Sequence, residues 1–216
     1  DLRNAINASR ETFKPGGVVN KCEGLIKKLF EYKCVKFGDF TLASGKQSPI
    51  YIDLRRVVSF PDLFKLTADA YVELLRELEF DLIAGVPYAA LPFSAVAALR
   101  MDRPLIYPRK EVKAHGTGMN IEGAFQKGDR VALVEDVITS GGSILKAAKT
   151  LRSAGLVVTD AVVLVDRKQG GVEALSQEGI NVHPVLDIFE IMDLLKSDGL
   201  IDAETYTSVM RYLQEG

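Results

Sequence analysis

The chain has 216 residues, of which 47% are hydrophobic and 26% charged, and its formal net charge is −2. This length and apolar content suffice for one substantial domain, and the near-neutral charge gives no overall argument for binding to nucleic acid or to a membrane. Cys22 and Cys34 are too few for a disulfide framework or a four-ligand zinc site, and together with an N-terminus that is not signal-like they predict a cytoplasmic protein.

The first part of the chain predicts a tail, a helix and a hairpin. Residues 1–17 are polar and end in Lys-Pro-Gly-Gly, which is typical of a tail or linker ahead of a domain over residues 18–216. An amphipathic helix is expected over 18–32. Residues 37–45 and 48–55 are predicted to pair as a small antiparallel hood, because apolar and polar side chains alternate along the first of these segments.

A second amphipathic helix is predicted over 61–79, and an uncharged stretch over 82–99 follows it. That stretch is about as long as a short membrane helix. However, Gly85, Pro87 and Pro92 interrupt it, so we expect a buried strand, a loop and a buried helix instead. A Gly/Pro loop after a strand is a place where α/β sheets bind ligands. The apolar face of the 61–79 helix is expected to comprise Leu63, Leu66, Ala70, Leu74 and Leu75.

The most informative stretch combines a strand, two acids and a small turn. Val-Ala-Leu-Val at 131–134 is typical of a strand buried on both faces of a parallel sheet, and Glu135 and Asp136 are expected at its end. The hydroxyl- and glycine-rich turn 139–143 leads into an amphipathic helix, for which Gly155 is the expected stop.

This turn favours binding of a phosphomonoester. Glycines allow backbone N–H groups to approach an anion, and the helix N-terminus and neighbouring hydroxyls add further attraction. The two carboxylates suit sugar hydroxyls, or a Mg²⁺ ion held through water. Phosphate, ribose and Mg²⁺ together describe phosphoribosyl pyrophosphate. The turn alone leaves open an ordinary strand–turn–helix with no ligand, whereas the missing Walker pattern disfavours a nucleoside triphosphatase.

The remaining pattern predicts the fold class. Apolar strands expected at 104–107, 161–165 and 182–186 alternate with helical segments, and two amphipathic helices are predicted near 188–195 and 202–213. This alternation predicts an α/β domain with a parallel sheet flanked by helices.

Two further segments carry charge near the expected ligand. Arg109, Lys110, Lys113 and His115 form a glycine-flanked basic loop that suits a polyphosphate leaving group, although a solvated surface loop is the usual explanation of such a run. Arg167 directly follows a predicted strand, where its guanidinium offers a fork for a carboxylate. A surface ion pair is the alternative for Arg167.

These segments occur in the order found in orotate phosphoribosyltransferases, which the chain resembles over roughly residues 20–195. The resemblance rests on segments 37–42, 48–55 and 85–88, on the basic loop, on the Glu135–Asp136 turn and on Asp166-Arg167. It implies the type I phosphoribosyltransferase fold with an N-terminal hood. Segments 48–55 and 85–92 are more similar to the domain of UMP synthase, which is fused to orotidine-5′-phosphate decarboxylase. A chain that starts at Asp1 fits such an excised domain.

The resemblance also implies a reaction and roles for residues. Orotate and phosphoribosyl pyrophosphate would give orotidine 5′-phosphate and pyrophosphate in de novo UMP biosynthesis, in a homodimer with shared active sites. The implied catalytic residues are Lys110, Glu135 and Asp136. Mg²⁺ is the implied cofactor, held by the substrate with at most a water-mediated contact to Asp136. The implied substrate-binding residues are Tyr51, Ile52, Tyr88, Arg109, Lys113, His115, Thr139, Ser140, Gly141, Gly142, Ser143 and Arg167.

The chain departs from the family pattern at two lysines. Ala43 and Ala89 stand where many members carry lysines near orotate and pyrophosphate, and Lys46 or Arg55 are candidates to replace those charges. The alternative function on the same fold is a regulator that senses phosphoribosyl pyrophosphate. Such a regulator needs a nucleic-acid-binding module, and none is evident in the sequence.

Overall fold

The computed structural model describes residues 18–41, 45–110 and 120–215. Within these ranges, no helix is long and apolar enough to cross a membrane. The elements in chain order are α2 (Val18–Glu31), β1 (Val35–Thr41), β2 (Gln47–Ile52), η1 (Leu54–Ser59), α3 (Pro61–Leu75), β3 (Leu82–Gly85), α4 (Leu91–Met101), β4 (Leu105–Pro108), β5 (Ile121–Glu122), β6 (Arg130–Ile138), α5 (Gly142–Ser153), β7 (Val157–Asp166), α6 (Gly171–Gln177), β8 (Asn181–Asp187), α7 (Ile188–Ser197) and α8 (Ala203–Glu215).

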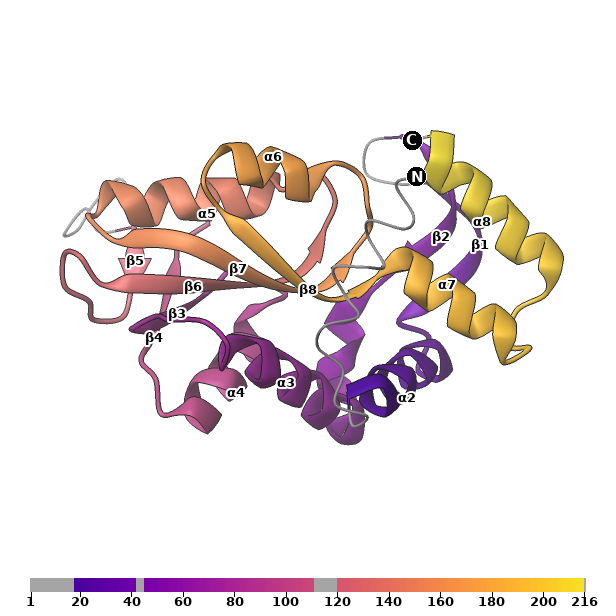
Figure 1. Cartoon of the computed structure of the whole chain (residues 1–216), viewed down its shortest axis with the longest axis horizontal. Helices are drawn as coiled ribbons and strands as arrows, with labels where there is room; N and C mark the ends of the chain where they lie inside the picture. The colour runs from indigo at the N-terminus through magenta and orange to yellow at the C-terminus, as the bar shows by residue number, and fades with distance from the viewer. Residues whose placement is uncertain (1–17, 42–44, 111–119, 216) are drawn as a thin grey trace.

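The core of the fold is a six-stranded sheet in the order β5-β4-β3-β6-β7-β8. Every neighbouring pair is parallel except β4 and β5, which are antiparallel. Helices α5 and α6 lie over one face of the sheet, and α3 and α4 lie over the other (Figure 1). The predicted parallel sheet flanked by helices is therefore confirmed.

Strand β6 lies inside the sheet and buries apolar side chains on both faces. Ala132 and Val134 belong to the core cluster that includes α3 and α4, whereas Val131 and Leu133 belong to the cluster that includes α5. Burial on both faces explains why the sequence of this strand is a continuous apolar run and does not alternate.

The predicted ends of β6 and α3 are wrong. Strand β6 continues to Ile138, because β7 pairs with it as far as Asp166, so both acids lie inside the strand and not after it. Helix α3 ends at Leu75 and not near residue 79. Its buried face also includes Thr67 and Tyr71, whereas three of the expected apolar residues are only half-buried: Leu66, Ala70 and Leu74.

The antiparallel hood is confirmed by the pairing of β1 with β2. Its second strand is shorter than predicted, because it ends at Ile52 and a 3₁₀ helix with buried Leu54 and Val57 follows. The hairpin lies with α7 and α8, on the side toward which the parallel strands run (Figure 1). The helix predicted after the turn 139–143 is α5, and Gly155 follows its C-cap with a φ of +89°, as expected for a helix stop.

Candidate active site

The two acids on β6 differ in their surroundings. The Glu135 side chain is buried, with 5% of its surface exposed, and its Oε2 accepts a hydrogen bond from Ser143 Oγ at 2.7 Å. Its Oε1 accepts from the backbone N–H of Asp136 at 3.1 Å. Asp136 is half-buried. Glu135 is thus tied to the start of α5, and Asp136 is the acid that remains accessible to a ligand.

Burial is the main reason that the pKa of Glu135 is raised to about 8. The neighbouring Asp136 raises it further, because two carboxylates this close repel each other when both are ionised. The hydrogen bond from Ser143 acts in the opposite direction. Near neutral pH, a large share of Glu135 therefore carries a proton when no ligand is bound.

The turn after β6 presents backbone donors. Gly141 is the N-cap of α5 with a φ of +77°, a conformation that glycine adopts without strain, and no described side chain caps the helix. The first N–H groups of α5 therefore stay available to an anion, with the helix dipole in support. Ser140, Gly142 and Ser143 are exposed, and Thr139 is half-buried. This geometry fits the predicted phosphate site.

Helix α6 packs against the backbone of this turn. A Cβ atom on Gly171 would lie 2.3 Å from the carbonyl oxygen of Thr139 and 2.9 Å from the backbone nitrogen of Gly141. A Cβ on Gly141 would in turn lie 2.9 Å from Leu175 of α6. The backbone of the turn and the start of α6 are therefore in such close contact that only glycine fits at position 171.

Arg167 lies at the neighbouring strand end. Its backbone N–H donates to the carbonyl oxygen of Ile138 at 3.0 Å, which places it beside the end of β6. Its Nε and Nη2 atoms are buried and have no hydrogen-bond partner among the described residues. The adjacent Asp166 interacts instead with Lys168, at 3.0 Å from its Nζ. A buried guanidinium without an acceptor is costly, so this group is suited to bind an anion.

The basic loop begins at a pocket of about 240 Å³. Lys110 Nζ lies 5.1 Å from the ring centroid of Tyr88, whose surface is 61% exposed. Arg109 forms an ion pair with Glu122 of β5, so it is held at the base of the loop. Lys113 and His115 lie outside the described residues. The pocket is lined by Pro87, Tyr88, Leu91, Tyr107, Pro108, Arg109 and Lys110.

Known proteins with similar sequences decide the family. The phosphoribosyl transferase domain matches residues 56–181. Orotate phosphoribosyltransferase of Pyrococcus furiosus is 44% identical to this chain, over 79% of the chain and 95% of the archaeal protein. The chain belongs to the orotate phosphoribosyltransferases.

Within this family, the chain also matches one part of larger proteins. The uridine 5′-monophosphate synthase of Bos taurus is 41% identical over 88% of this chain, which covers 40% of the bovine protein. The structure of Leishmania donovani UMP synthase superposes with a TM-score of 0.85 at 41% identity, over 99% of this chain and 45% of the other. The chain therefore spans less than half the length of these synthases and nearly all of the archaeal transferase.

The hood residues expected to bind orotate lie apart from the main sheet. Tyr51 is in β2, where its hydroxyl accepts a hydrogen bond from Arg55 Nη2 at 3.0 Å. Arg55 also pairs with Asp53 at 2.7 Å, which leaves it poorly suited to replace a missing family lysine. Ile52 is half-buried at the end of the same strand, and Ala43 lies outside the described residues.

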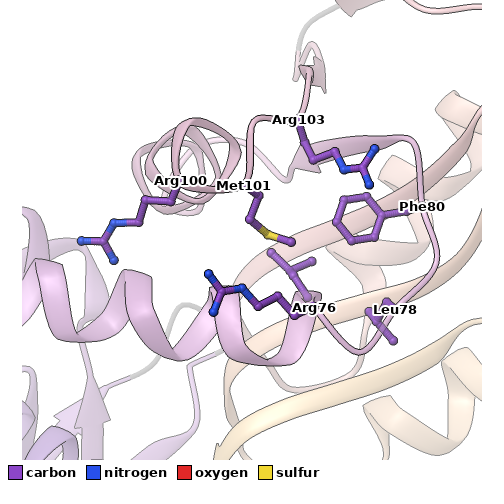
Figure 2. A pocket seen from close by; sticks show the side chains of 7 residues that line it. Arg76, Leu78, Phe80, Arg100, Met101 and Arg103 are labelled. Carbon is purple, nitrogen blue, oxygen red and sulfur yellow. The ribbon is translucent and has the colours of Figure 1, made fainter.

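A second cavity, of about 320 Å³, lies away from the candidate active site. It lies where α3 and α4 end, ahead of β3 and β4, and thus at the opposite end of the parallel sheet from Asp136. Three arginines line it, but their guanidinium groups point in different directions (Figure 2), and Arg100 is paired with Asp69. The lining residues are Leu75, Arg76, Leu78, Phe80, Arg100, Met101 and Arg103.

Proposed function

We propose that this chain transfers the 5-phosphoribosyl group from phosphoribosyl pyrophosphate to orotate, giving orotidine 5′-phosphate and pyrophosphate in pyrimidine biosynthesis. The observation that carries the proposal is Arg167, whose backbone lies beside the end of β6 and whose buried Nε and Nη2 atoms have no hydrogen-bond partner among the described residues. Orotate differs from uracil in carrying a carboxylate, which matches a guanidinium fork in charge and shape.

The phosphoribosyl donor would be held by the turn after β6. Its 5′-phosphate accepts hydrogen bonds from backbone N–H groups of the turn and from the hydroxyls of Thr139 and Ser140. Ser143 would contribute through its backbone N–H, because its hydroxyl already donates to Glu135. Gly142 is exposed and leaves room for the phosphate, whereas Gly141 allows the turn to pack against α6. The ribose would then lie next to β6, because the turn follows directly after Ile138.

The acids would then act on the ribose. When the bond to pyrophosphate breaks, positive charge develops at C1 of the sugar, and a fixed carboxylate nearby stabilises that charge. Asp136 is the accessible acid, and it is suited to bind the ribose hydroxyls. Glu135 fixes the start of α5 through Ser143 and adds negative charge when it is ionised.

The residues of the site fit a Mg²⁺ ion that arrives with the substrate. No group of three or more His, Cys, Asp or Glu side chains in the described ranges could hold a metal ion directly. Asp136 is the residue that would reach such an ion, through water. When bound, Mg²⁺ neutralises charge on the pyrophosphate and makes it a better leaving group.

The chain would act as a homodimer in which the basic loop of one subunit covers the pyrophosphate in the other. Lys110 is exposed beside the Tyr88 pocket, where it is available to a second subunit. The larger relatives suggest that the natural polypeptide also carries orotidine-5′-phosphate decarboxylase. Residues 18–216 would then form the transferase domain, with 1–17 as its linker.

Substitution of Arg167 tests the proposal. Arg167→Ala removes charge-assisted hydrogen bonds to one substrate only, so KM for orotate should rise by about 10- to 100-fold while KM for phosphoribosyl pyrophosphate changes little. Arg76→Ala, at the distant cavity, is the matched control and should leave both constants unchanged. Equal increases in the two KM values after Arg167→Ala would contradict the proposed orotate site.

A further inference from the structure

A buried tyrosine lies directly behind the acid pair. Tyr71 is on the inward face of α3 with none of its surface exposed, and its ring stacks on Phe93 with centroids 5.7 Å apart. Its hydroxyl donates a hydrogen bond to the backbone carbonyl of Glu135 at 2.7 Å. A side chain of α3 thus reaches through the core to the strand that carries the acids.

The hydroxyl occupies a position where the pairing of two strands is interrupted. Strands β6 and β7 pair Glu135 with Val163 and Val137 with Val165, and no pair is made between Asp136 and Leu164. The Tyr71 hydroxyl lies at this gap, because it binds the carbonyl of Glu135. The hydroxyl therefore donates to β6 next to the residue whose pairing with β7 is missing.

Both polar groups of the peptide unit between Glu135 and Asp136 form hydrogen bonds. Its carbonyl group, that of Glu135, accepts from Tyr71, and its N–H group, that of Asp136, donates to the Glu135 carboxylate at 3.1 Å. The Glu135 side chain points toward α5, where Ser143 binds it. The orientation of this peptide determines where both carboxylates point.

We propose that Tyr71 is a positioning residue, whose hydroxyl fixes the peptide between Glu135 and Asp136 and so aims the Asp136 carboxylate at the ribose. The inference rests on the proposed function, because it assigns the acid pair to the transferase reaction. Without the hydroxyl, the Glu135 carbonyl loses a buried partner, and the peptide is no longer held in one orientation. Tyr71 itself touches neither substrate.

The same helix provides a matched control. Thr67 lies one turn before Tyr71, is equally buried, and its Oγ1 has no hydrogen-bond partner among the described residues. Tyr71→Phe and Thr67→Val each remove one buried hydroxyl from α3 with little change in shape. Only the first removes a hydrogen bond to the strand of the acids.

The test compares kcat, both KM values and Tm of these variants, with orotate and phosphoribosyl pyrophosphate as substrates. A displacement of a catalytic group by about 1 Å costs about 10²-fold in rate, so Tyr71→Phe should lower kcat by about 10- to 100-fold. KM for orotate should stay within about 2-fold of wild type, because Arg167 is untouched. Thr67→Val should keep the wild-type kcat.

A third variant separates positioning from stability. Phe93→Leu loosens the packing against the Tyr71 ring but leaves the Tyr71 hydroxyl in place. It should therefore lower Tm, whereas kcat measured well below Tm should equal that of the wild type. If Tyr71→Phe lowers Tm yet keeps the wild-type kcat, or fails to fold at all, the hydroxyl serves only the fold and the inference is wrong. A wild-type chain with no activity on these substrates would instead overturn the proposed function.

Discussion

At the scale of single residues, the neighbouring acids Glu135 and Asp136 differ in burial and in hydrogen bonding. Glu135 and Asp136 are two consecutive acids in the sequence, but one is buried against Ser143 and the other is half-exposed. The sequence predicted an acid pair near a phosphate site, and it could not predict this division. Which acid is buried depends on the strand continuing to Ile138, and that extension comes from pairing with a strand distant in the sequence.

The raised pKa of Glu135 predicts how stability depends on pH. Its pKa in the folded protein is about 8, above the ordinary value of 4.5, so folding favours the protonated form. The stabilisation by this group is fully present below the ordinary value, and it is lost as pH rises toward 8 and beyond. Without ligand, the wild-type Tm should therefore decrease as pH is raised from about 5 to about 9. Glu135→Gln should make this decrease smaller.

The Tm measurement against pH needs a control for the loss of a negative charge alone. Glu173 is an exposed acid in the first turn of α6, and Glu173→Gln removes the same charge from a solvated position. Its Tm profile should run parallel to that of the wild type. Equal slopes for wild type and Glu135→Gln would show that the buried acid does not govern the profile.

At the scale of elements, the turn 139–143, which we propose binds phosphate, depends on the short helix α6 packed against it. Gly171→Ala places a methyl group within 2.3 Å of the Thr139 carbonyl oxygen, so the turn must shift. A shifted turn binds the 5′-phosphate poorly, and KM for phosphoribosyl pyrophosphate should rise by about 10-fold or more. Steady-state kinetics with each substrate varied in turn would measure this, and KM for orotate should change less.

A second glycine serves as the control for stability loss. Gly179 follows the same helix with a φ of +69°, and a Cβ there would meet no atom within 4 Å. Gly179→Ala should therefore cost about 1–2 kcal/mol of stability through backbone strain alone. It should leave both KM values unchanged. If it raises KM for phosphoribosyl pyrophosphate as much as Gly171→Ala does, the effect is not specific to the turn.

The sequence predicted long periodic elements well and short ones poorly. The 61–79 helix, the strands of the parallel sheet and the two C-terminal helices were each predicted near their observed places, because each has a clear apolar pattern. Strand β5 covers only Ile121–Glu122 and α6 only Gly171–Gln177, too few residues for a pattern to emerge. Both are positioned by contacts with distant segments.

The same limit applies to the candidate site. The turn, the acids and Arg167 were predictable because they follow apolar runs whose strand ends meet at one edge of the sheet. The Tyr71 hydrogen bond was not, because a tyrosine on an apolar helix face gives no sign of what its hydroxyl contacts. Nor was the pairing of Arg109 with Glu122, which depends on the antiparallel strand β5.

At the scale of the whole molecule, the proposal that two subunits share each site can be tested by complementation. Lys110→Ala and Asp136→Asn should each be nearly inactive, since one removes charge from the leaving group and the other damages the ribose site. Refolded together, they form mixed dimers in which one site receives an intact Asp136 and the partner's intact Lys110. Random pairing makes half the dimers mixed and half of their sites whole, so about a quarter of wild-type activity should return.

The control for this experiment is proof of subunit exchange. Two differently tagged copies of the wild-type chain, refolded under the same conditions, should co-purify as a mixed dimer. With exchange established, no recovery of activity would show that Lys110 acts within its own subunit, or not at all.

The central claim is that the site at the carboxyl ends of β6 and β7 transfers a phosphoribosyl group to orotate. The most direct measurement is product formation after the chain is mixed with orotate, phosphoribosyl pyrophosphate and Mg²⁺. The account predicts that orotate absorbance falls while orotidine 5′-phosphate and pyrophosphate appear in equal amounts, and that Asp136→Asn slows this reaction by about 10²-fold. Unchanged orotate, in a folded wild-type chain that binds phosphoribosyl pyrophosphate, would contradict it.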